Sequence, residues 1–126
     1  MAREYRIDGE DFIVYAPIRY SMQDIDDLMS TALEGGINYW CRRAEVNETD
    51  YYGEYASDQI SRGGSLTLYD AESEDKWVLD LDKLMHGLCL ALADRQAAIS
   101  ADPDDWDADT ADVVIQYALF NEIVFG

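Results

Sequence analysis

The feature of this sequence that most constrains its fold is an amphipathic helix that ends at a pair of glycines. Apolar residues recur from Ile25 to Leu33 with the i, i+3, i+4, i+7, i+8 spacing of one helix face, which predicts a helix over about residues 22–34. Gly35 is suited to the left-handed position after the last turn, and Gly36 frees the exit of the chain. Such a helix buries one face, so it requires other elements to pack against.

The residues that follow this helix predict a strand. Residues 37–46, INYWCRRAEV, are rich in aromatic and β-branched side chains. In a strand Tyr39 and Trp40 point to opposite faces, so we expect the core to bury at most one of them fully. The other would then be covered by a helix, by a partner or by a second copy of the chain, which would make the protein a homodimer.

The rest of the chain alternates between strand and helix patterns. The expected elements are strands at 3–8, 12–18, 65–70 and 76–80, a short helix at 53–64, a helix from 81 to about 95 capped by Asp80 or Asp82, and a last helix capped by Asp107 or Asp109, which EIVFG at 122–126 either extends or follows as a short strand. Ser21, with Asp24 three positions on, predicts a capping box at the start of the first helix. We therefore predict one α+β domain over residues 1–126, with a mainly antiparallel sheet of about four to six strands and three to four helices packed on it.

Net charge is the outlying property of the composition. The chain holds 27 acidic and 9 basic residues, for a net charge of −18, and no basic residue follows Arg95. Such a surface repels nucleic acids and anionic membranes. No apolar run approaches the roughly 20 residues that span a bilayer. We expect a cytoplasmic protein of the host cell whose partners are basic proteins or cations.

The segment DPDDWDADTAD at 102–112 invites a calcium interpretation. Residues 105–109 reproduce the D-x-D-x-D start of an EF-hand loop. Thr110 then replaces the glycine of the sharp turn, and Gln116 replaces the closing glutamate. We therefore expect no bound metal, and a solvated loop whose aspartates cap a helix remains the simplest local explanation.

The same carboxylates also resemble nucleic acid in charge. Duplex DNA carries one negative charge per roughly 1.7 Å of axis, a density that carboxylates along a loop and a helix face approach. Trp106 would be an aromatic anchor in such a contact, or else would pin the loop to the core. The predicted contact residues are Asp102, Asp104, Asp105, Trp106, Asp107, Asp109 and Asp112 in this segment, Asp70, Glu72, Glu74 and Asp75 in a turn, and Glu45, Glu48 and Asp50 around another turn.

Other chemistry has little support in the sequence. Cys41, Cys89 and the single histidine, His86, are too few for a zinc site, and we expect both cysteines to be buried free thiols. Catalytic motifs are scarce, so we expect neither an enzyme nor a cofactor. A rival cause of the charge is adaptation to high salt, because 18 of the 27 acidic residues are aspartates and only 2 of the basic residues are lysines.

Three separated blocks resemble a group of small acidic proteins encoded in phage, prophage and other mobile-element genomes. The blocks are ALEGGINYWC (32–41), EYASDQISRGGSLTLYDAES (54–73) with KWVLDLDKLMHG (76–87), and DADTADVVIQYALFNEIVFG (107–126). Small acidic phage proteins include inhibitors of host defence, such as anti-CRISPR and anti-restriction proteins that mimic nucleic acid. The resemblance implies a context and assigns no role to any single residue.

Charge and resemblance together favour a non-enzymatic, anti-CRISPR-like inhibitor of a host defence complex. Its partner would be a basic nucleic-acid-binding protein, such as a CRISPR effector or a restriction enzyme, and the chain itself would bind neither nucleic acid nor membrane. The alternative is a small ligand- or protein-binding module with a pocket near Tyr39 and Trp40, whose acidity reflects solubility or salt adaptation.

Overall fold

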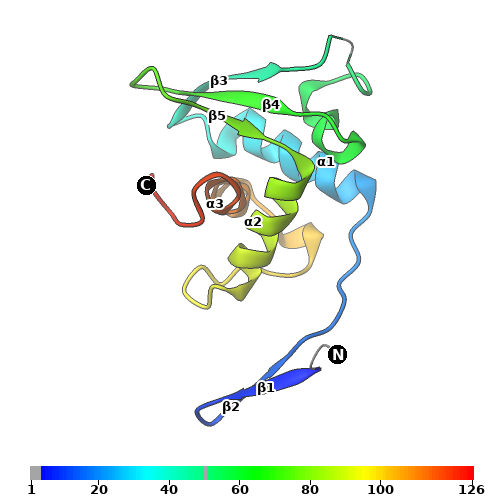
Figure 1. Cartoon of the computed structure of the whole chain (residues 1–126), viewed down its shortest axis with the longest axis vertical. Coiled ribbons are helices and arrows are strands. Elements are labelled where there is room, and N and C mark those ends of the chain that lie inside the picture. The colour runs from blue at the N-terminus through cyan, green and yellow to red at the C-terminus, as the bar shows by residue number, and fades with distance from the viewer. Residues whose placement is uncertain (1–3, 50) are drawn as a thin grey trace.

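The main sheet is an antiparallel meander of three strands in the order β3–β4–β5. A computed structural model describes residues 4–49 and 51–126 of the chain (Figure 1). The central strand carries the fully buried Leu66 and Leu68, which pair with Val46 and Ala44 of β3. The strands are β3 (Cys41–Val46), β4 (Leu66–Asp70) and β5 (Lys76–Leu79).

Three helices cover one face of this sheet (Figure 1). The last two pack against each other along their length, and the first continues into a π-helical turn. The helices are α1 (Met22–Thr31), with η1 (Ala32–Gly36) as its π-helical continuation, α2 (Leu81–Ala93) and α3 (Ala108–Phe120), and the 3-10 turns are η2 (Ala56–Asp58), η3 (Ile60–Arg62) and η4 (Pro103–Asp105).

The predicted caps are confirmed. Ser21 and Asp24 form a reciprocal capping box, in which the Ser21 Oγ accepts from the Asp24 N–H at 3.0 Å and the Asp24 carboxylate accepts from the Ser21 N–H at 2.9 Å. Asp80 is the N-cap of α2 and Asp107 is the N-cap of α3. Each carboxylate accepts a hydrogen bond from the backbone N–H three residues on, at 2.9 Å.

The core lies between the sheet and the helices. Its buried apolar side chains include the predicted stripe of α1. The prediction of two buried thiols is half correct, because Cys41 is buried and Cys89 lies on the exposed side of α2. The buried apolar residues are Ile25, Leu28, Met29, Ala32, Ile37, Trp40, Cys41, Ile60, Leu66, Leu68, Leu79, Leu84, Leu88, Ala91, Ala111, Val114, Ile115 and Ala118.

The first helix ends differently from the prediction. Gly35 is not in the left-handed region, and the helix widens into a π turn that closes with the Ile37 N–H donating to the Ala32 carbonyl at 3.1 Å. A Cβ on Gly36 would lie 2.8 Å from the Ala108 carbonyl oxygen of α3. Glycine is therefore required at this position by the close approach of α3.

The strand predicted at 37–46 begins only at Cys41. Residues 37–40 form a turn in which the N–H groups of Trp40 and Cys41 both donate to the Ile37 carbonyl. Trp40 is 2% exposed and Tyr39 is 54% exposed, so the prediction that at most one of them is fully buried is confirmed. The cause is the turn and not the alternation of a strand.

The predicted α+β class is confirmed, but the sheet under the helices is smaller than expected. Residues near the N-terminus pair with each other in a separate two-stranded sheet, formed by β1 (Tyr5–Asp8) and β2 (Asp11–Val14). This hairpin stands away from the rest of the molecule in Figure 1. The described residues thus hold five strands in two sheets, with three strands in the main sheet.

The C-terminal residues neither extend α3 nor form a strand. Asn121 ends α3 in the left-handed conformation, with a φ of 59°. The tail then turns back, and the backbone N–H groups of Val124 and Phe125 both donate to the Gln116 Oε1 at 2.8 Å. The Phe125 ring stacks on Trp40 with the centroids 5.0 Å apart and the planes within 5°.

Candidate partner-binding surface

Two aromatic rings hold the acidic 102–112 segment near the start of α1. The rings of Tyr20 and Trp106 lie with their centroids 5.0 Å apart. The Tyr20 hydroxyl donates to the Ala101 carbonyl at 2.7 Å, and the Trp106 Nε1–H donates to the Ser100 carbonyl at 2.8 Å. Trp106 therefore fixes its own loop, which is the second of the two roles that the sequence suggests for it.

Carboxylates from α1 and from the loop come together beside these rings. Asp24 and Asp27 of α1 and Asp104 of η4 line one shallow depression of about 60 Å³. Asp104 and Asp27 are exposed, and Asp24 is half-buried by its capping bonds. Residues some 80 positions apart in the sequence thus share one surface.

Asp102 adds a fourth carboxylate to this surface, because it caps η4 by accepting from the Asp104 N–H at 3.0 Å. Burial raises the pKa of Tyr20 most, and the negative charges of Asp24 and Asp102 raise it further. We call Asp24, Asp27, Asp102 and Asp104 the acidic face. The predicted contact residues omit Asp24 and Asp27, because nothing in the sequence indicates that the loop folds onto α1.

The remaining aspartates of the loop are exposed but have local roles. Asp107 caps α3. The hydrogen bond that its carboxylate accepts from the Thr110 N–H holds the pKa of this carboxyl below its usual range. Asp105 accepts from the Ser100 Oγ at 2.8 Å, and Asp109 lies in the first turn of α3, where a negative charge is favourable. Within residues 4–49 and 51–126, no three acidic, histidine or cysteine side chains gather in a way that would hold a metal ion.

Asp112 lies inside a hydrogen-bonded cluster. Its carboxylate accepts from the Tyr39 hydroxyl at 2.6 Å, from the Trp40 Nε1–H at 2.8 Å and from the Gln116 Nε2 at 2.9 Å. Tyr39 and Trp40 therefore reach the same carboxylate. Because both oxygens of this carboxylate already accept hydrogen bonds from its own chain, we leave Asp112 out of the acidic face.

This cluster predicts a pH dependence of stability. Partial burial, together with the hydrogen bond and charge of Asp112, raises the pKa of Tyr39 to about 12. In the unfolded chain the hydroxyl ionises near pH 10, so its contribution to stability is complete below pH 10 and is lost as the pH rises towards 12. Urea unfolding across this range should therefore show a steeper loss of stability for the wild type than for Tyr39→Phe. Equal slopes for the two proteins would contradict the assignment.

The other two predicted acidic clusters lie at opposite ends of the main sheet. Strand β4 runs from Leu66, which pairs with Val46, to Asp70, which pairs with Cys41. The 45–48 carboxylates are consequently at one end of the strand and the 70–75 turn is at the other (Figure 1). These two clusters therefore do not merge into one stripe.

Several of these carboxylates are bonded within the chain. Glu48 accepts from the Ser65 N–H at 2.8 Å, and Asp70 accepts from the Ser73 Oγ at 2.6 Å. Glu45 lies 3.3 Å from Arg43 in an exposed ion pair. The three side chains at the tip of the β4–β5 hairpin, Glu72, Glu74 and Asp75, are exposed, and Asp50 lies outside the described residues.

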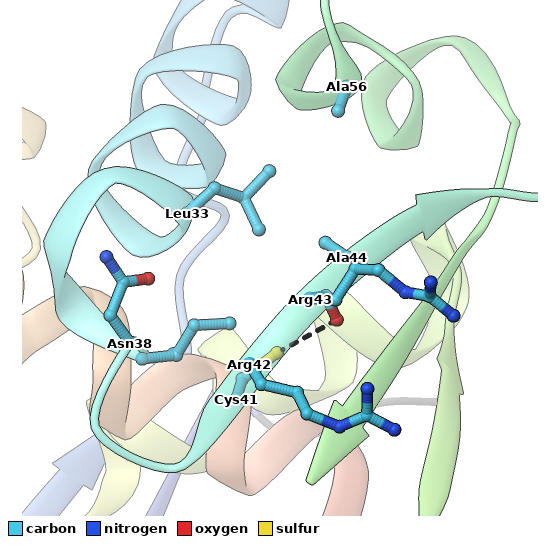
Figure 2. Close-up of a pocket in the computed structure, with 8 residues that line it drawn as sticks. Leu33, Asn38, Cys41, Arg42, Arg43, Ala44 and Ala56 are labelled. Carbon is cyan, nitrogen blue, oxygen red and sulfur yellow. Dashed lines mark hydrogen bonds between the residues drawn. The ribbon is translucent and has the colours of Figure 1, made fainter. Parts of the chain in front are cut away.

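A larger hollow lies elsewhere on the described surface. It has a volume of about 550 Å³ and lies between η1, the free edge of β3 and η2. Figure 2 shows Leu33, Ala44 and Ala56 around it, with the Arg42 and Arg43 side chains extending away. Its lining includes Asn38 and Cys41, which flank Tyr39 and Trp40 in the sequence, but neither aromatic ring.

No family model matches the chain, and no curated protein or solved structure matches it either. Within the described residues no helix is both long and apolar enough to cross a bilayer. The functional argument therefore depends on the surface itself.

Proposed function

We propose that the protein inhibits a host defence complex that binds nucleic acid, such as a CRISPR effector or a restriction enzyme. The acidic face would occupy the basic groove that otherwise holds DNA or RNA, without catalysis and without a cofactor. The observation that carries this proposal is that carboxylates of α1 and of the 102–104 loop are joined on one surface. The net charge of −18 adds long-range attraction to any basic partner.

The rigidity of the acidic face favours binding. The loop is fixed by the Tyr20 and Trp106 rings, and Asp102 caps η4 by accepting from the Asp104 N–H at 3.0 Å. A surface that is already ordered loses little conformational entropy when it binds. The resemblance to small acidic phage proteins supports the same proposal as context only.

A displacement assay tests this function. Purified CRISPR effector complexes and restriction enzymes are loaded with a fluorescently labelled DNA duplex, and the protein is added at increasing concentration. We expect release of the duplex from at least one of these complexes at low salt, and weaker release as the salt concentration rises. Polyaspartate at the same concentration of charge is the control. The proposal fails if no complex releases its duplex, or if polyaspartate releases it equally well.

The hollow beside β3 favours a second function, that of a protein-binding module. A strand edge without a sheet neighbour, next to a groove of mixed polar and apolar lining, is a common site for an added strand. Substitutions in this groove would leave DNA displacement unchanged if the acidic face is the inhibitory surface. If they abolished displacement, the groove would be the site of contact with the target.

A further inference from the structure

The N-terminal hairpin presents an apolar face that its own chain leaves open. The register pairs Tyr5 with Val14 and Ile7 with Phe12, so these four side chains lie on one face. They are 56%, 71%, 63% and 71% exposed, respectively. A two-stranded hairpin is at best marginally stable in water without cover, so this face requires a partner.

The groove beside β3 has the complementary features. Strand β3 has a sheet neighbour on one side only, which leaves the hydrogen-bonding groups of its other edge free of sheet partners among the described residues. The adjoining hollow of about 550 Å³ has apolar side chains in its lining, among them Leu33, Ile37 and Ala56. A second hollow, of about 290 Å³, shares Leu33 and Ala56 and extends the groove past Tyr55.

The hairpin of the same chain lies far from this groove. Figure 1 shows the hairpin beyond the N-terminal end of α1 and β3 at the opposite end of the molecule. Asp11 of the hairpin lies 3.4 Å from Arg95 in an ion pair whose side chains are largely exposed, so this pair holds the hairpin weakly and can be given up when the hairpin docks elsewhere. A second copy of the chain can supply the hairpin that fills the groove.

If the hairpin is added to the β3 edge as further strands, its two faces are complementary to the two sides of the main sheet. On β3, Ala44 packs against the core and lines the groove, whereas the Arg42 and Arg43 guanidinium groups lie over the Tyr69 ring at 5.2 and 4.3 Å. Tyr69 follows the fully buried Leu68 in β4, so its ring is on the outer side of the sheet. A hairpin added to this edge with its apolar face over the groove turns its other face to the outer side. That other face carries Asp8 and Asp11 together with Arg6 and Ile13, so its net charge is −1, and the two acids lie side by side at its turn end. The acids therefore meet the arginines while the apolar side chains cover the groove.

We propose that two copies of the chain exchange their N-terminal hairpins, each hairpin adding to the β3 edge of the other copy. The exchange is reciprocal, so it closes as a two-fold dimer. Each main sheet then has five strands, three of its own and two from the partner. This proposal does not depend on the inhibitory function.

Charge reversal tests the exchange in the full-length chain. One variant carries Asp8→Arg and Asp11→Arg, and the other carries Arg42→Glu and Arg43→Glu. Each variant places like charges at both of its own junctions, so we expect sedimentation to show the wild type as a dimer and each variant about tenfold or more weaker in self-association. When the two variants are mixed, both junctions regain opposite charges, so we expect a heterodimer.

A third variant, in the apolar face of the hairpin, tests whether the hairpin itself forms the dimer contact. A variant carrying Ile7→Lys and Phe12→Lys should also be monomeric, and because both side chains are largely exposed its body should keep the circular dichroism of the wild type. The proposal is overturned if the wild type is a monomer at about 100 μM, which would exclude a dissociation constant in the low micromolar range. It is also overturned if the reversed variants dimerise as tightly as the wild type, or if mixing them gives no heterodimer.

Discussion

The Trp40→Ala variant is expected to lose about 3–5 kcal/mol of its free energy of unfolding. Trp40 is 2% exposed and stacks on Phe125 at 5.0 Å between centroids. It also contacts Trp77 and Phe120 edge to face, at 5.8 and 6.1 Å. Alanine would leave a cavity between the sheet, α3 and the C-terminal tail, and would remove one of the donors to Asp112.

The neighbouring residue supplies the control for this experiment. Tyr39→Ala removes an aromatic ring that is 54% exposed, along with a hydrogen bond to the same carboxylate. Equilibrium unfolding in urea, followed by far-ultraviolet circular dichroism, should place this variant much closer to the wild type than Trp40→Ala. A Trp40→Ala protein within about 1 kcal/mol of the wild type would show that the ring is not central to the core.

Local signals account for the elements that were predicted correctly. The caps at Ser21, Asp80 and Asp107 depend on side chains that bond to a backbone N–H three residues on, so sequence spacing alone identifies them. The β4–β5 hairpin likewise follows from alternation and a polar turn.

The features that were missed depend on contacts between distant segments. The π turn at 32–36 lies directly against the backbone of α3. A Cβ added at Gly36 would be only 2.8 Å from the Ala108 carbonyl oxygen. The C-terminal tail is placed by Gln116, a buried polar residue whose partners lie eight and nine positions on. Sequence periodicity carries no information about either contact.

The candidate site shows the same division. The aspartates of the 102–112 segment are evident from the sequence. That Asp104 shares a surface with Asp27 is not, because it depends on the packing of the Tyr20 ring against the Trp106 ring. Asp26, two positions after Asp24, is instead buried and lies 3.2 Å from Arg62 in an ion pair. Charge in a sequence therefore marks candidate carboxylates, and the fold determines which of them share a surface.

Neutralising the acidic face is expected to have the largest effect on inhibition. A variant with Asp27→Asn, Asp102→Asn and Asp104→Asn removes three charges, and asparagine at 102 retains the cap of η4. Because these carboxylates would meet basic side chains in the target groove, we expect the affinity to fall by about tenfold or more, which is about 1.4 kcal/mol. The salt dependence of binding should become weaker as well.

The turn between β4 and β5 offers a control with the same change in net charge. A variant with Glu72→Gln, Glu74→Gln and Asp75→Asn also removes three charges, from exposed residues at the far end of the sheet. The decisive measurement compares DNA displacement by the two variants on a complex from which the wild type releases DNA. The acidic face accounts for inhibition if its variant loses displacement about tenfold while the tip variant stays within about twofold of the wild type. Equal losses would contradict it, because they would make total charge, and not this surface, the cause.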